Sequence, residues 1–229
     1  QKSLDGAILF YKPDEVYNLA AQSSTAAAWE APEATGNING LGALRILEAI
    51  RLGIKILGKE IRFYQAISAQ IFDNPDGGAQ NENTRLAATA NPYSTAKLYA
   101  YATTIAYRRN HKMFAVNGIT FSHESPRRPF EFVTRKISRE AAKISLGMSN
   151  ELLLGNLEGL RDWGFAGDYV DAMWLSLQQD TPDDYVIATG EIHSVKDFVE
   201  EAFNFLGLDW KKYVKQDPKF MRRAEDEHP

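Results

Sequence analysis

The sequence predicts an α/β fold, in which a Rossmann-like parallel sheet with helices on both faces is joined to a smaller mixed α/β lobe. Short apolar runs that end in small polar residues recur three times in the first half, which is typical of buried strands. Segments with helical apolar spacing separate these runs, and right-handed crossovers then give a covered parallel sheet. The pattern of predicted helices and strands changes after about residue 138. We therefore expect one domain at 1–138 and a second at 139–229, with segments of the second returning to the sheet.

Composition excludes several classes of protein. The 229 residues are 44% hydrophobic and 24% charged, which indicates one or two globular domains rather than disorder. A net charge of -4 argues against recruitment of nucleic acid or anionic membrane. The chain has no cysteine, which excludes disulfides and thiolate sites, and no apolar stretch reaches the roughly 20 residues of a membrane span. We therefore expect a cytoplasmic protein.

The predicted strands are 15–20 ("EVYNLA"), 61–68 ("IRFYQAIS") and 113–121 ("MFAVNGITF"), and "DYVIATG" at 184–190 is a later one. Ligands of parallel α/β sheets bind beyond the carboxyl ends of the strands. The small polar residues that follow the first three strands should therefore converge on one crevice.

Helices are predicted at 40–52 and 92–109, and later at 139–148 and 194–208. In the first helix, Gly40 and Gly42 could allow close contact with the sheet. The second helix has Asn91 as a plausible cap and Pro92 in its first turn.

The second helix carries Tyr93 and Lys97, four residues apart and therefore on one face. An adjacent ammonium favours the phenolate form of a tyrosine, which could then take a proton from a substrate hydroxyl. The spacing alone is better explained by two residues that share one surface face of a helix, and the neighbouring motifs change that balance.

The stretch "NPYSTAKLYAY", one helix after a strand that ends in "AISAQ", resembles the extended short-chain dehydrogenase/reductases. Further motifs narrow the resemblance to the GDP-mannose 4,6-dehydratases: "PDEVYNLAAQS", "FSHESPRR", "TRKI", "LRDWGFAGDYV" and "YVIATGEIHSVKDFVE". The resemblance covers almost the whole chain. It implies a lyase that converts GDP-mannose to GDP-4-keto-6-deoxymannose with NADP, a step toward GDP-fucose, and that forms dimers or tetramers.

The resemblance also implies roles for individual residues. The catalytic set would be Ser68, which binds the 4-hydroxyl of the sugar, Tyr93 as the base and Lys97, with Gln70 at the position of the elimination base. Contacts with the cofactor would come from Tyr93 and Lys97 and from Leu19, Ala20, Ala21, Gln22, Ser23, His123 and Arg128. The nucleotide sugar would meet Ser68, Asn117, Lys136 and Arg161.

Gln70 departs from the family, which has a glutamate there. A neutral amide cannot accept a proton at useful pH, so oxidation at C4 could persist while dehydration fails. Glu124 or a water molecule could substitute. Ile67 and Asp73 also differ from the family pattern, within seven residues of each other.

The glycine-rich phosphate loop of dinucleotide-binding folds does not occur in these residues, and the resemblance starts near the helix before the family's fourth strand. The cofactor prediction therefore depends on the resemblance. The four histidines have no spacing that suggests a metal site, and we expect none.

Three hypotheses follow. The first is a GDP-mannose 4,6-dehydratase-like enzyme, and the second is a nucleotide-sugar epimerase or 4-ketoreductase of the same superfamily, motivated by Gln70. The third is a catalytically inactive binding or assembly subunit.

Overall fold

The computed structural model describes residues 1–73, 78–87 and 91–221, and the chain divides into two compact units. The first unit comprises Gln1–Phe121 and Gly167–Ile187, and the second comprises Ser122–Ala166 and the residues from Ala188 onward. The boundary predicted at residue 138 differs from this division. The chain leaves the large sheet earlier, because the short strand β4 (Ser122–Glu124) pairs with β7 (Trp163–Phe165) inside the second unit.

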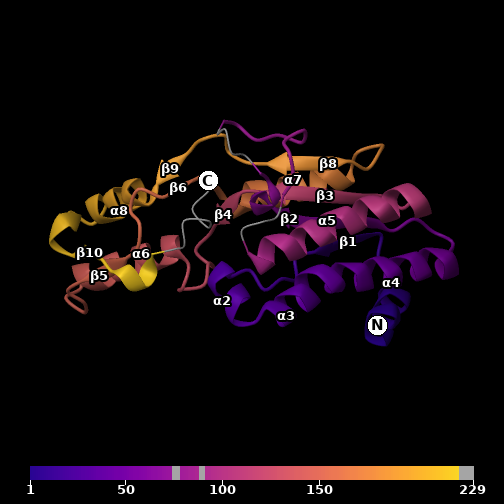
Figure 1. Ribbon diagram of the computed structural model, residues 1–229, viewed down its shortest axis with the longest axis horizontal. Coiled ribbons are helices and arrows are strands. Elements are labelled where there is room, and N and C mark those ends of the chain that lie inside the picture. Colours follow the sequence, from indigo (N-terminus) through magenta and orange to yellow (C-terminus); the bar gives the residue numbers. More distant parts are fainter. Residues whose placement is uncertain (74–77, 88–90, 222–229) are drawn as a thin grey trace. The chain divides into compact units, whose positions relative to one another are not determined.

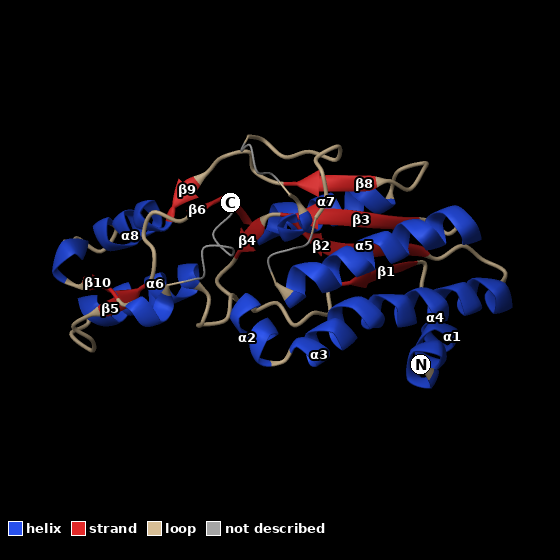
Figure 2. Ribbon diagram, viewed as in Figure 1, coloured by secondary structure: helices blue, strands red, loops and turns tan. Residues whose placement is uncertain are grey.

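The first unit is built on four parallel strands in the order β1-β2-β3-β8. They are β1 (Glu15–Asn18), β2 (Arg62–Ser68), β3 (Ala115–Thr120) and β8 (Asp184–Ile187), drawn as neighbouring arrows in Figure 2. All four strands agree with the predicted runs to within a few residues, and the predicted parallel α/β fold is confirmed.

Helices cover both faces of this sheet (Figure 1). Leu47 and Ile50 of α4 (Gly42–Leu57) pack with Phe63 of β2, beside α5 (Pro92–His111). On the other face, Met173 and Leu177 of α7 (Ala166–Leu177) pack with the strand side chains that alternate with those facing α4. Helix α1 (Lys2–Tyr11) lies on α4, where a Cβ at Gly53 would come within 2.5 Å of Ile8 Cγ2. None of the helices within the described ranges is long and apolar enough to cross a membrane.

Helical structure begins earlier than the predicted start at residue 40, with α2 (Thr25–Glu30), α3 (Pro32–Thr35) and the π-helical η1 (Gly36–Leu41). Ser24 caps α2, because its side chain accepts the backbone N–H of Ala27. The predicted contact between Gly40 and the sheet is wrong. A Cβ at Gly40 would lie 3.2 Å from a ring carbon of Tyr99, so Gly40 instead allows η1 to approach α5.

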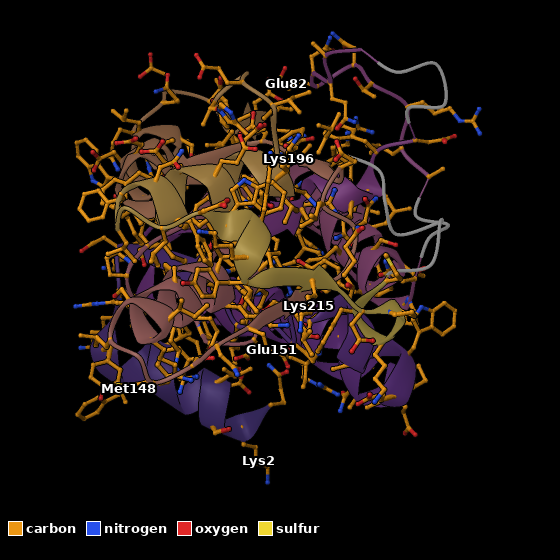
Figure 3. All side chains as sticks on the ribbon, turned by 90° about the vertical axis from the view of Figure 1, so that its left-hand side faces the viewer. Lys2, Glu82, Met148, Glu151, Lys196 and Lys215 are labelled. Carbon is orange, nitrogen blue, oxygen red and sulfur yellow. The ribbon has the colours of Figure 1, made fainter. Side chains whose placement is uncertain are left out.

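The second unit is a smaller α/β body around Ile137, Leu152, Val199 and Phe203. Its helices are α6 (Val133–Ser145) and α8 (Val195–Asn204), with 3₁₀ turns η3 (Trp210–Lys212) and η4 (Pro218–Phe220). Strands β5 (Leu152–Leu154) and β10 (Val214–Gln216) are parallel, and β6 (Leu160–Arg161) and β9 (His193–Ser194) are antiparallel. Near the β5/β10 pair, Lys215 and Glu151 form a surface ion pair of 2.8 Å (Figure 3).

Candidate active site

Ser68 is the last residue of β2 and begins a 3₁₀ turn, η2 (Ala69–Ile71). Its Oγ accepts the backbone N–H of Gln70 at 3.3 Å, which is the usual role of a capping serine. A hydroxyl that accepts one hydrogen bond still has its proton to donate. Ser68 can therefore donate a hydrogen bond to a substrate oxygen.

Helix α5 begins beside this turn, and its start is fixed by a capping box. Asn91 Oδ1 accepts the N–H of Ser94 at 2.9 Å, while Ser94 Oγ accepts the N–H of Asn91 at 3.3 Å. Pro92 is the first helical residue, where its missing N–H costs nothing. This cap places Tyr93 in the first turn and Lys97 in the second.

Lys97 is buried, with 4% of its surface exposed, and its Nζ donates to the carbonyl of Ala66 in β2 at 2.8 Å. Burial lowers the pKa of the Lys97 ammonium to about 8. The same Nζ lies 5.8 Å from the centre of the Tyr93 ring. The predicted side-by-side placement of the tyrosine and the lysine is present in the structure.

A chain of buried amides, which the sequence analysis missed, joins Lys97 to the end of β1. Asn18 Nδ2 donates to Gln65 Oε1 at 2.8 Å, and Gln65 Nε2 donates at 3.0 Å to the Ala66 carbonyl that also receives Lys97. Asn18 Oδ1 in turn accepts the N–H of Ala20 at 3.3 Å. The amides are 47 residues apart in sequence, and only the parallel pairing of β1 with β2 brings them together.

The loop after β1 contains the five predicted cofactor contacts, Leu19, Ala20, Ala21, Gln22 and Ser23. Asn39 of η1 holds this loop, because its side chain exchanges two hydrogen bonds of 2.8 and 2.9 Å with the backbone of Gln22. The side-chain Oε1 of Gln22 is buried and has no partner among the described residues. Two hydrogen bonds thus tie the loop to η1, and the loop has a buried acceptor, which is compatible with a bound polar group.

Gln70 lies in η2 with its side chain exposed, and its Oε1 lies 3.4 Å from Asn91 Nδ2. The position predicted for the elimination base is therefore next to the start of α5, close to Ser68. Glu124, the suggested substitute, belongs to the second unit. Its carboxylate accepts from Thr134 Oγ1 at 2.6 Å and pairs with Arg128 at 3.3 Å.

His123, Arg128, Lys136 and Arg161, predicted to contact cofactor or nucleotide sugar, all lie in the second unit. The Arg128 guanidinium stacks on Phe132 with 3.7 Å between its central carbon and the ring centre. Lys136 Nζ donates to the Leu153 carbonyl at 2.6 Å and lies over Phe220, and burial lowers its pKa.

Arg161 lies in β6, next to Asp162, which accepts the backbone N–H groups of Thr189 and Gly190. Trp163 packs against Phe198 with ring centres 5.7 Å apart. In the "RDWG" motif, the aspartate and tryptophan thus have structural contacts of their own, and the substrate contact of Arg161 stays a prediction.

Asn117 of β3, predicted to contact the nucleotide sugar, is fully buried. Its Nδ2 donates to Asp184 Oδ1 at 3.0 Å and to the Tyr101 carbonyl at 3.3 Å. The amide nitrogen therefore joins β3, β8 and α5 inside the first unit, and this placement gives no support to a substrate contact. Two tyrosines of α5 donate to carboxylates, Tyr101 to Asp184 and Tyr107 to Glu48.

A cavity of about 750 Å³ lies against the first turns of α5, but Tyr93 and Lys97 do not line it. Its walls come from residues 29–41 and from Asn91, Pro92, Thr95, Ala96 and Tyr99. These α5 residues form a different face of the helix from the face that carries Tyr93 and Lys97.

Comparison with known proteins shows which family the chain resembles. The family model described as GDP-mannose 4,6 dehydratase matches residues 1–228. GDP-mannose 4,6 dehydratase 2 of Arabidopsis thaliana is 50% identical over 214 residues, which are 93% of this chain and 57% of the relative. The Homo sapiens GDP-mannose 4,6 dehydratase is 48% identical over 196 residues, 86% of this chain and 52% of the relative. The chain thus spans a little over half the length of these curated relatives.

Solved structures share the fold at lower identity. RMD from Pseudomonas aeruginosa complexed with NADPH superposes with a TM-score of 0.83 at 24% identity, covering 94% of this chain and 70% of that one. DesIV, a dTDP-glucose 4,6-dehydratase from Streptomyces venezuelae with NAD and TYD bound, gives 0.82 at 18% identity, covering 97% and 66%. From the match over residues 1–228, the chain belongs to the GDP-mannose 4,6 dehydratase family.

Proposed function

We propose that this chain acts in a GDP-mannose 4,6-dehydratase-type reaction, in which GDP-mannose is converted to GDP-4-keto-6-deoxymannose. The observation that carries the proposal is the cluster of Ser68, Tyr93 and buried Lys97 at the carboxyl end of β2. Family membership and the names of the relatives in plants and animals support the substrate.

We propose NADP as the cofactor, with NAD as the alternative. RMD was solved with NADPH and DesIV with NAD. The clamped loop at 19–23, the buried acceptor of Gln22 and the ammonium of Lys97 fit a ribose and nicotinamide near β1 and β2. When bound, the nicotinamide would accept hydride from C4 of the sugar and later return it to C6.

In the oxidation half, Tyr93 would take the proton of the 4-hydroxyl as the C4–H bond breaks. Ser68 would donate a hydrogen bond to the same oxygen, which fixes its direction. The Lys97 ammonium favours the phenolate of Tyr93 by its charge, and burial strengthens this effect.

In the elimination half, a base must remove the C5 proton while the C6 hydroxyl leaves as water. Gln70 occupies that position and its neutral amide cannot accept the proton. Loss of a general base typically slows a step by about 10²- to 10⁴-fold. We therefore propose that C4 oxidation is retained and that dehydration is slow.

Gln70 also favours a second candidate, a nucleotide-sugar epimerase or 4-ketoreductase, because neither reaction needs a C5 base at that position. The products separate the two functions, since only dehydration converts the C6 hydroxymethyl group to a methyl group. We further propose a cytoplasmic homo-oligomer, dimer or tetramer, as the working assembly.

The test uses a chimera in which residues 1–229 replace the matching region of the Arabidopsis thaliana relative. With GDP-mannose and NADP, the chimera carrying Gln70→Glu should form the 4-keto-6-deoxy sugar. Gln179→Glu adds the same charge at another exposed glutamine of the first unit and should form no more product than the parent chimera. Absence of product with Gln70→Glu, despite cofactor binding measured by nicotinamide fluorescence, would reject the dehydratase proposal. If the cofactor does not bind either, the inactive-subunit hypothesis is favoured.

A further inference from the structure

The cap of α5 and the residue at the elimination position are in contact. Asn91 is almost fully buried, and its side chain works in two directions. Oδ1 accepts the N–H of Ser94 at 2.9 Å, and Nδ2 lies 3.4 Å from Gln70 Oε1.

The cap decides which way both amides point. Only the side-chain oxygen of Asn91 can accept the helix N–H, so its NH₂ group must face the other way, toward Gln70. Two NH₂ groups cannot hydrogen bond to each other, so Gln70 must turn its oxygen toward Asn91. The NH₂ group of Gln70 then points away from α5, and it has no acceptor within the described part of the chain.

The backbone of Gln70 is fixed as well, because its N–H donates to Ser68 Oγ at 3.3 Å. Gln70 is therefore held at its main chain by Ser68 and at its side-chain oxygen by Asn91. The free end that remains is the exposed NH₂ group, in the same short turn as the serine proposed to bind the 4-hydroxyl.

We propose that Asn91 is a positioning residue which makes position 70 a hydrogen-bond donor toward the sugar. The inference rests on the proposed function in one respect, that Gln70 faces the sugar. A donor at this point binds a carbonyl or hydroxyl oxygen of the oxidised sugar, whereas dehydration needs an acceptor for the C5 proton. The Asn91–Gln70 pair thus favours reactions in which the sugar is not dehydrated and keeps its C6 hydroxyl.

The same contact explains how a carboxylate would behave at position 70. In Gln70→Glu the NH₂ group of Asn91 would donate to the new carboxylate, which favours its charged form and lowers its pKa. If Asn91 is also replaced by aspartate, the helix stays capped but two carboxylates face each other. The pKa of the base then rises by about one unit or more.

The first experiment needs no activity. In residues 1–229, Asn91→Asp keeps the cap and removes the donor, so the Gln70 amide should rotate and donate to the aspartate. The NMR signals of the Gln70 NH₂ group should shift and exchange with solvent several-fold more slowly. Asn110→Asp, an exposed replacement at the other end of α5, should leave them unchanged. An unshifted Gln70 signal in folded Asn91→Asp overturns the proposal.

The second experiment measures the pH dependence of dehydration in the chimera. A general base works only when ionised, so a higher pKa moves the rising limb of the pH–rate profile upward. We expect Gln70→Glu with Asn91→Asp to shift this limb by about one pH unit or more relative to Gln70→Glu alone. Identical profiles would overturn the role of Asn91, while an inactive Gln70→Glu chimera with shifted NMR signals would overturn the proposed function instead.

Discussion

Two cations on α5, one partly buried and one buried, differ in what surrounds them. The side chain of Arg108, near the carboxyl end of the helix, is 15% exposed and forms an ion pair with Asp184, which is 13% exposed. Lys97, near the amino end, is 4% exposed, and no carboxylate among the described residues pairs with it. Its ammonium donates to the carbonyl of Ala66.

The comparison contrasts a charge that is paired within the fold with a buried charge that has no carboxylate partner among the described residues. Asp184 also accepts from Tyr101 at 2.8 Å and Asn117 at 3.0 Å, so the Asp184 carboxylate finds its partners within the fold. A buried ammonium with no carboxylate partner among the described residues keeps part of its desolvation cost, and its pKa falls to about 8. One end of α5 therefore holds a charge that is paired within the first unit, and the other holds a charge 5.8 Å from the centre of the Tyr93 ring.

The largest expected effect breaks the paired end. Asp184→Ala leaves the partly buried Arg108 guanidinium without its nearest carboxylate and should lower the free energy of unfolding by about 3 kcal/mol. The neighbouring Asp183 is the matched control, since it is 76% exposed and lies 3.8 Å from Arg108. Asp183→Ala should cost no more than about 1 kcal/mol in urea unfolding. Equal losses in the two variants would remove the contrast.

Replacement of the unpaired cation should have the opposite sign. Lys97→Met removes a buried charge and should raise the free energy of unfolding at pH 7 by on the order of 1–3 kcal/mol, while abolishing C4 oxidation. Lys55→Met, at an exposed position of α4, should change stability by no more than about 0.5 kcal/mol. A destabilised Lys97→Met would show that the ammonium supports the fold.

The pH dependence of the free energy of unfolding should also show the cost of burying the Lys97 ammonium. The Lys97 ammonium loses its proton at about pH 8 in the folded chain and near 10.5 when unfolded. Between these values the unfolded chain binds more protons, so the free energy of unfolding should rise with pH, and below about pH 8 the full cost of burial remains. The rise is read as the difference between the wild-type chain and Lys97→Met, and a flat difference from pH 8 to 10.5 contradicts it.

The smallest effect is expected in the second unit. Lys215 and Glu151 form an ion pair of 2.8 Å, but their side chains are 63% and 43% exposed. Lys215→Ala should therefore change the free energy of unfolding by about 0–1 kcal/mol, and added salt should reduce even that. A loss as large as that of Asp184→Ala would show that exposure does not govern these charges.

Much of the first unit could be predicted because its signals are local. Short apolar runs bounded by small polar residues gave β1, β2 and β3, and the Asn-Pro start gave α5 with Tyr93 and Lys97 on one face. Family resemblance supplied Ser68 and Gln70, and the structure places both in one turn beside Asn91.

What could not be predicted depends on contacts between distant residues. The amides of Asn18 and Gln65 pair across two strands. Asn117 donates to Asp184, which lies in a strand of the first unit that follows part of the second unit in sequence. Nothing in the local sequence specifies either partner. The capping role of Asn91 could be predicted from the local sequence, but its contact with Gln70 could not.

If the residues for C4 oxidation are intact while the elimination base is missing, the absorbance of the nicotinamide should show it. The chimera with Gln70 is mixed with GDP-mannose and NADP, and reduced nicotinamide is followed by its absorbance. We expect reduced nicotinamide to accumulate, because hydride leaves C4 and no dehydrated sugar forms to receive it, and we expect Tyr93→Phe to prevent this. Fast formation of the 4-keto-6-deoxy sugar with Gln70 in place, or no reduced nicotinamide despite bound cofactor, would contradict it.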